Sequence, residues 1–213
     1  MRALFVGNSF TARNDLPGTL AHLAEWAGES LRHELLWAGG ASLRMHWNKG
    51  VARETIERTR PDVVVLQEQS TLPIKNAKRF HENVRLFDEA VRASGARTAL
   101  YLTWARRHAP ETQRALTDAY TAIGAELGAL VVPVGVAWER VCATPGAPDL
   151  YDADGSHPSA AGSYLAACTF FAALFGKSPV GAPVHGGGVA SDEAALLQDA
   201  AWRSVPSSTS PHA

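Results

Sequence analysis

Hydrophobic residues occur along the chain in short runs that alternate with amphipathic stretches. Five runs have the length, and several the β-branched content, of buried strands: residues 3–6, 35–37, 62–66, 98–103 and 130–134. Between and after them, apolar residues at helical spacing predict helices over residues 16–27, 43–60, 75–94, 111–127, 136–142 and 158–175. The residue before the next apolar pattern, Ser191, is predicted to cap a last helix. Strands and helices therefore alternate through most of the chain.

This alternation predicts an α/β fold. Helical crossovers between successive strands imply a parallel sheet covered on both faces, which is a three-layer α/β/α architecture. We expect a five-stranded parallel sheet with the flavodoxin-like order 2-1-3-4-5 and a site outside the carboxyl ends of its strands. No internal repeat or linker is visible, so residues 1–203 are predicted to form one domain. Residues 204–213, rich in Ser and Pro, are predicted to be a disordered tail.

Composition and charge narrow the function classes. The 213 residues suit one domain, and a net charge of −1 provides no electrostatic footprint for nucleic acid or an anionic membrane. The two cysteines, Cys142 and Cys168, lie in apolar surroundings and are predicted to be buried free thiols. Neither a secretory signal nor a membrane span is visible, so we expect a cytoplasmic protein. Nothing in the sequence indicates the oligomeric state.

Small polar residues follow the first predicted strand. Gly7 stops the apolar run, and Asn8 and Ser9 come next. Because α/β folds place catalytic groups at the carboxyl ends of strands, Ser9 is a candidate nucleophile. The alternative is a serine that only caps a turn or a helix.

A candidate base and its orienting acid lie together before the helix predicted over residues 158–175. Asp154 and His157 are three residues apart, which lets the carboxylate reach a ring nitrogen of the imidazole. That contact fixes the tautomer and leaves the other nitrogen free to take a proton from a hydroxyl. The alternative is a surface loop in which Asp154 caps the following helix.

Candidate oxyanion donors follow the second and third predicted strands. Gly40 could offer a backbone N–H that no side chain blocks. Gln67, Glu68 and Gln69 come directly after the third strand, and an amide side chain there could donate to a developing oxyanion. Polar turn residues are the alternative.

Taken in this order, these features resemble the SGNH/GDSL hydrolase family over residues 2–176. The Asp-Gly-Ser-His-Pro block and the Gly-x-Ser after the first strand are the most specific matches. The resemblance implies that Ser9 is the nucleophile, His157 the base and Asp154 its orienting acid. It assigns the oxyanion hole to the N–H groups of Ser9 and Gly40 and to an amide side chain. It also makes small acyl esters, such as acetyl groups on carbohydrates, the expected substrates.

Two positions depart from the family pattern. Asn8 stands where the family usually has Asp before the Ser, but this residue is not the proton acceptor. After the third predicted strand the family normally has a Gly-x-Asn-Asp pattern, and this sequence has Gln67, Glu68 and Gln69 there instead. We therefore assign the third oxyanion donor to Gln69 by its distance past the strand, with Gln67 as the second choice.

Other motifs are absent or less specific. The His residues show no metal-binding spacing, and no phosphate-binding or dinucleotide motif is present, so no metal and no cofactor is expected. Trp104 and Arg106 follow the fourth strand, and His46 follows Gly40; these three are candidate substrate-binding residues. An aromatic wall and a guanidinium could bind a substrate carboxylate or a sugar hydroxyl. Surface charge and core aromatics are the alternative.

The leading interpretation is a metal-independent serine esterase that acts on a small-molecule or carbohydrate ester through an acyl-enzyme. Two alternatives stay open. One is a non-catalytic flavodoxin-like module that binds a small polar ligand, and the other is acyl transfer to an acceptor other than water. The spacing of Asp154 and His157 favours an enzyme, because a binding module does not need an oriented base.

Overall fold

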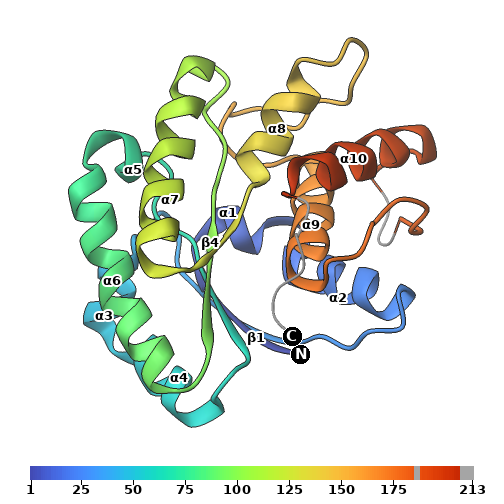
Figure 1. Cartoon of the computed structure of the whole chain (residues 1–213). Coiled ribbons are helices and arrows are strands. Elements are labelled where there is room, and N and C mark those ends of the chain that lie inside the picture. The colour runs from blue at the N-terminus through green and yellow to red at the C-terminus, as the bar shows by residue number, and fades with distance from the viewer. Residues whose placement is uncertain (185–187, 207–213) are drawn as a thin grey trace.

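A parallel β-sheet runs through the middle of the molecule (Figure 1). The structure is a computed structural model, and it describes residues 1–184 and 188–206. Within these residues, one sheet with the order β2-β1-β3-β4-β5 contains β1 (Arg2–Gly7), β2 (Arg32–Trp37), β3 (Val63–Leu66), β4 (Arg97–Tyr101) and β5 (Leu130–Val132). Each strand pairs with its neighbours in parallel. The predicted fold class and strand order are confirmed.

Helices cover both faces of the sheet (Figure 1). One layer contains α2 (Leu16–Trp26), α8 (Val134–Cys142), α9 (Ala160–Phe175) and α10 (Ser191–Ser204). The opposite layer contains α3 (Leu43–Lys49), α4 (Val51–Thr59), α6 (Ala77–Ala93) and α7 (Gln113–Leu127). Four short turns of helix complete the described elements: α1 (Ser9–Ala12), η1 (Arg13–Asp15), α5 (Leu72–Lys75) and η2 (Pro110–Thr112).

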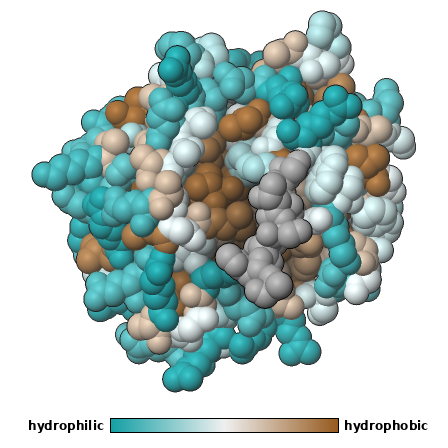
Figure 2. Space-filling model, viewed as in Figure 1, coloured by the Kyte–Doolittle hydropathy of each residue, from teal (hydrophilic) through white to brown (hydrophobic). Residues whose placement is uncertain are grey.

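The sheet separates two hydrophobic clusters. Along β1, Ala3 and Phe5 belong to one cluster, whereas Leu4 and Val6 belong to the other. Successive side chains of a strand point to opposite faces, so a strand covered by helices on both faces is apolar at every position. This is why β1 and β3 contain continuous apolar runs, whereas the edge strand β2 is partly exposed and begins with Arg32, His33 and Glu34. Figure 2 shows hydrophobic side chains in the hollow between the two helical layers and mainly hydrophilic ones around it.

Four local predictions differ from the structure. The helix expected over residues 43–60 is two helices, because Gly50, with φ of 80°, ends α3 and precedes α4. Pro158 does not begin α9; it forms a β-bridge, and the Ser159 side chain caps the helix. Ser191 is the first residue of α10 rather than its cap. Cys168 is buried as expected, but Cys142 is exposed.

The end of the chain is described only in part. Helix α10 extends to Ser204, and residues 207–213 of the predicted tail lie outside the described residues. Among the helices that the structure describes, none is long and apolar enough to cross a membrane.

Candidate active site

The turn after β1 places Ser9 at the carboxyl edge of the sheet. Asn8 caps the short helix α1, because its side-chain oxygen accepts a hydrogen bond from the Phe10 N–H at 3.0 Å. Gly7, which ends the strand, is tightly enclosed: a Cβ at this position would lie 2.6 Å from the Thr11 hydroxyl. Only glycine fits so close an approach, and Ser9 follows it as the first residue of α1.

A buried amide supports this turn. Gln67 Oε1 accepts hydrogen bonds from the Asn8 N–H at 2.8 Å and the Thr11 hydroxyl at 3.1 Å, and Gln67 Nε2 donates to the Glu68 carbonyl. The Asn8 side chain in turn donates to the Ala41 carbonyl at 3.0 Å. These bonds join the turn after β1 to the loops after β2 and β3. Both ends of the Gln67 amide are therefore engaged inside the protein.

A chain of hydrogen bonds joins Ser9 to the loop before α9. Ser9 Oγ lies 2.8 Å from His157 Nε2, and His157 Nδ1 bonds to Asp154 Oδ2. The other carboxylate oxygen, Asp154 Oδ1, accepts from the backbone N–H groups of His157 at 2.8 Å and Ser156 at 2.9 Å. Hydrogen bonds from the His157 ring and from these two N–H groups lower the pKa of Asp154. An ionised carboxylate on Nδ1 favours the tautomer whose Nε2 can accept the serine proton.

Aromatic packing holds this loop on the sheet. Trp104 stacks on Phe10 at 4.9 Å and on Trp138 at 3.8 Å between ring centroids. Its indole N–H donates to the Ser156 carbonyl at 3.1 Å, and Phe10 contacts the His157 ring edge-on at 5.4 Å. The sequence suggested Trp104 as a substrate-binding residue. Its exposure of 1% makes it part of the core, and it also lines a small cavity described below.

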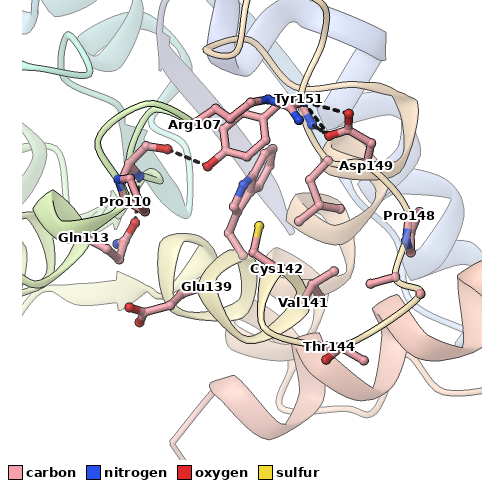
Figure 3. Close-up of a pocket in the computed structure, with 15 residues that line it drawn as sticks. Arg107, Pro110, Gln113, Glu139, Val141, Cys142, Thr144, Pro148, Asp149 and Tyr151 are labelled. Carbon is pink, nitrogen blue, oxygen red and sulfur yellow. Dashed lines mark hydrogen bonds and ion pairs between the residues drawn. The ribbon is translucent and has the colours of Figure 1, made fainter.

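The segment after β4 also anchors the start of the same loop (Figure 3). The Arg107 guanidinium donates to both carboxylate oxygens of Asp149 at 2.7 Å and lies 4.8 Å from the Tyr151 ring. The Arg107 N–H donates to the Gly155 carbonyl at 2.9 Å, and the Tyr151 hydroxyl donates to the Ala105 carbonyl at 2.8 Å. These contacts border a separate cavity of about 510 Å³. They restrain the backbone that presents the imidazole, and the sequence did not reveal them.

Two backbone N–H groups at the carboxyl edge of the sheet, those of Ser9 and Gly40, have no acceptor among the described residues. Ser9 itself is in the first turn of α1, where N–H groups have no partner within the helix. Gly40 is exposed and has φ of 63°, a left-handed conformation that favours glycine. Neither N–H donates a hydrogen bond to any residue that the structure describes. Both can therefore donate to a substrate oxygen that reaches them.

The Gln69 amide has a defined orientation. Its Oε1 accepts from the backbone N–H groups of Thr71 at 2.9 Å and Leu72 at 3.0 Å, and from the Thr71 hydroxyl at 3.0 Å. A backbone N–H can only donate, so the atom facing these groups must be the oxygen. The amide NH₂ of Gln69 is then the free end of the side chain. In this respect it differs from the Gln67 amide.

Between these two glutamines lies a buried carboxylate. Glu68 is 0% exposed and accepts hydrogen bonds from the N–H groups of Leu43 at 3.0 Å and Gln69 at 2.7 Å, and from the Asn83 amide at 2.9 Å. Burial raises the pKa of Glu68. The carboxylate joins the loop after β2 to the loop after β3 and so positions Gly40 relative to Gln69. In the sequence, the only indication of this supporting role was an acidic residue two positions after a buried strand.

Two other predicted substrate-binding residues have different environments. His46 is 7% exposed, and its Nε2 lies 2.7 Å from the Gly7 carbonyl, so it supports the turn from within the protein. Burial lowers the pKa of His46, which favours the neutral ring that donates from Nε2. The expectation that His46 contacts the substrate is therefore not supported. Arg106 is half-buried and lines a cavity at the carboxyl edge of the sheet.

The arrangement has the chemistry of acyl transfer. A hydroxyl is hydrogen-bonded to an imidazole and the imidazole to a carboxylate, which is the arrangement that activates a serine nucleophile. Among the described residues, no group of three His, Cys, Asp or Glu side chains could hold a metal ion.

Similarity to known proteins is found among solved structures and not among family models or curated proteins. Neither a family model nor a curated protein matches this chain. Among solved structures, a protein of Slackia heliotrinireducens described as an SGNH hydrolase is 30% identical and has a TM-score of 0.69. That match covers 82% of this chain and 98% of the other.

Two further solved structures are more distant in sequence. A DUF4886 family protein from Bacteroides uniformis is 19% identical over 95% of this chain and 93% of its own, with a TM-score of 0.78. A catalytic mutant of an acetylxylan esterase from Geobacillus stearothermophilus is 17% identical over 81% and 93%, with a TM-score of 0.62. At these identities the likeness shows the fold alone.

Proposed function

This chain belongs to the SGNH hydrolase family, and from that premise we propose that it is a serine esterase whose nucleophile is Ser9. The observation that carries the proposal is the hydrogen-bond chain from Ser9 through His157 to Asp154, with 2.8 Å between Ser9 Oγ and His157 Nε2. A serine hydroxyl is a weak nucleophile unless a base removes its proton. The imidazole supplies that base without a metal ion.

In the first half of the proposed reaction, Ser9 Oγ attacks the ester carbonyl carbon while His157 Nε2 takes the hydroxyl proton. The Asp154 carboxylate stabilises the imidazolium that forms. When the tetrahedral intermediate collapses, the ester C–O bond breaks and the alcohol leaves with the proton from His157. In the second half, His157 removes a proton from water, and the resulting attack releases the acid and restores Ser9.

The charge that develops on the carbonyl oxygen needs donors that are already in place. We assign this role to the N–H groups of Ser9 and Gly40 and to the free NH₂ of Gln69. Support comes from their shared position at the carboxyl ends of β1, β2 and β3, and from the lack of a described acceptor for either backbone N–H. Asn8, Gln67 and Glu68 are positioning residues, because their hydrogen bonds tie the three loops together.

The proposed substrates are short-chain acyl esters, with O-acetyl groups on carbohydrates as the specific case. An acetylxylan esterase among the structural neighbours supports this choice at the level of the fold. No residue of the described site by itself selects acetyl over another small acyl group.

The test is to incubate the full chain with 4-nitrophenyl acetate and, separately, with a fluorophosphonate. We expect turnover of the ester and a single covalent adduct that peptide mass spectrometry assigns to Ser9. A protein that hydrolyses no short-chain ester and forms no adduct contradicts the proposal. Adding an alcohol during turnover separates hydrolysis from acyl transfer, because a transferase would release the acetylated alcohol instead of acetate.

Replacing Gln69 by glutamate separates its two roles. The carboxylate keeps an oxygen for the N–H groups of Thr71 and Leu72 but has no NH₂ to donate. We expect kcat on 4-nitrophenyl acetate to fall by about 10²-fold, the usual loss when one oxyanion donor is removed, with an almost unchanged melting temperature. Gln69→Ala, which also loses the accepted hydrogen bonds, should lower both. A Gln69→Glu variant with the parent kcat would remove this side chain from the oxyanion hole.

A further inference from the structure

A small cavity lies at the carboxyl edge of the sheet, between the loop after β4 and α5. Its volume is about 250 Å³, and its lining includes Ser70, Thr71, Lys75, Trp104 and Arg106. A cavity of this size suits a small group rather than a long acyl chain.

The cavity adjoins the proposed reaction centre through two of its walls. Ser70 and Thr71 directly follow Gln69 in the chain, and the Thr71 N–H and hydroxyl hold the Gln69 amide oxygen. On the other side, Trp104 stacks on Phe10, the residue after the proposed nucleophile. A group bound in the cavity therefore lies next to the loops that carry the nucleophile and its oxyanion donors.

The ionisable side chains that line the cavity are all basic. Arg106, Lys75 and His108 contribute to the lining, and none of the described lining residues is Asp or Glu. Arg106 Nε is buried and has no hydrogen-bond partner, and neither Arg106 nor Lys75 forms an ion pair with a described residue. Arg107, the next residue, differs in this respect, because its Nη2 donates to both carboxylate oxygens of Asp149.

A buried guanidinium N–H without an acceptor is unfavourable, and most buried donors in proteins are paired. An anionic ligand would supply the missing acceptor. A carboxylate suits this position well, because its two oxygens match the planar guanidinium and form charge-assisted hydrogen bonds.

We propose that this cavity is a subsite for a carboxylate carried by the ester substrate, with Arg106 as the residue that binds it. The inference rests on the proposed esterase function and adds a substrate class to it, namely anionic esters. The carboxylate can belong to the acyl part or to the alcohol part of the ester, and matched substrates distinguish the two sources.

The experiment measures kcat/KM for two pairs of esters in the parent and in Arg106→Gln. The first pair is mono-4-nitrophenyl succinate, with a carboxylate on the acyl part, and neutral 4-nitrophenyl butyrate. The second pair is 4-acetoxybenzoate, with a carboxylate on the alcohol part, and neutral 4-acetoxybenzamide. Comparing each ester between the two proteins cancels its intrinsic reactivity.

We expect Arg106→Gln to lower kcat/KM for the anionic member of at least one pair by at least about tenfold more than for its neutral partner. The responding pair identifies the part of the ester that carries the charge. Arg106→Lys should keep part of the preference. Arg114→Gln is the matched control, since it removes the same charge from a 92% exposed position on α7 and should affect both members of a pair equally. An equal effect of Arg106→Gln on charged and neutral esters overturns the proposal.

A binding measurement separates this subsite from the esterase function itself. Tryptophan fluorescence follows the titration of Ser9→Ala protein with monomethyl succinate or neutral dimethyl succinate, because Trp104 lines the cavity. We expect the charged ligand to bind more tightly, and Arg106→Gln to weaken its binding at least about tenfold. If binding shows this difference but the parent protein hydrolyses no ester, the subsite stands and the esterase function fails. If esters are hydrolysed but neither kcat/KM nor binding depends on Arg106, the subsite fails alone.

Discussion

Replacing Ser9 by alanine is expected to lower kcat on 4-nitrophenyl acetate by at least about 10³-fold and to abolish the fluorophosphonate adduct. The nucleophile, base and acid act as a unit, so removing the nucleophile removes most of the rate enhancement that the three produce together. The remaining N–H donors preserve only a small part of that enhancement. The side chain makes one hydrogen bond in the described structure, to His157, so the melting temperature should change little.

Ser94→Ala is a suitable control for this change. Ser94 ends α6 at the amino-terminal edge of the sheet, and its hydroxyl bonds only to the Val91 carbonyl. We expect this variant to hydrolyse the ester at the parent rate. Ester turnover that persists in Ser9→Ala would assign the activity to another nucleophile or to a contaminant.

The second large effect is expected for Asp154→Asn. The asparagine oxygen can still accept from the N–H groups of Ser156 and His157, so the loop should keep its shape. Its NH₂ then faces His157 Nδ1 and favours the tautomer with the proton on Nε2, which cannot accept the proton of Ser9. We expect kcat to fall by about 10²- to 10⁴-fold with little change in KM, measured by steady-state kinetics on 4-nitrophenyl acetate.

The neighbouring Asp152 provides a matched control. It lies in the same loop and pairs with Arg13 rather than with the imidazole. Asp152→Asn removes the same charge, and we expect kcat within about threefold of the parent value because an exposed ion pair contributes little. Equal losses in the two variants would show that the charge of the loop matters and not the contact between Asp154 and His157.

The fold was largely predictable because the inner strands are buried on both faces, whereas the edge strand β2 is partly exposed. Such strands appear as apolar runs, and the stretches between them are long enough for helical crossovers, so the alternation predicted a parallel sheet. The order 2-1-3-4-5 was expected as the flavodoxin-like arrangement of such a sheet, and the structure confirms it. The boundary at Gly50 was missed because the apolar periodicity continues from α3 into α4. The positive φ of a single glycine, which breaks the helix, has no effect on that periodicity.

The roles of neighbours around the site were less predictable. The sequence offered His46 and Trp104 as candidate substrate-binding residues, because Trp104 follows the fourth strand and His46 follows Gly40, with core aromatics or surface charge as the alternative. Both side chains turn inward, where they bond to the Gly7 and Ser156 carbonyls. A residue can follow a strand end and still point into the core, since local sequence does not determine the direction of a side chain in a loop.

By itself, the sequence determined which groups could do chemistry and at which edge of the sheet they would gather. The contact between Asp154 and His157 followed from three residues of separation within one turn. Only the tertiary structure decided that Ser9 meets His157 across 148 residues, and that Gln67 and Glu68 support the loops of the proposed oxyanion hole. These contacts join separate segments, so they depend on how the strands pair and how the loops pack, which no local pattern encodes.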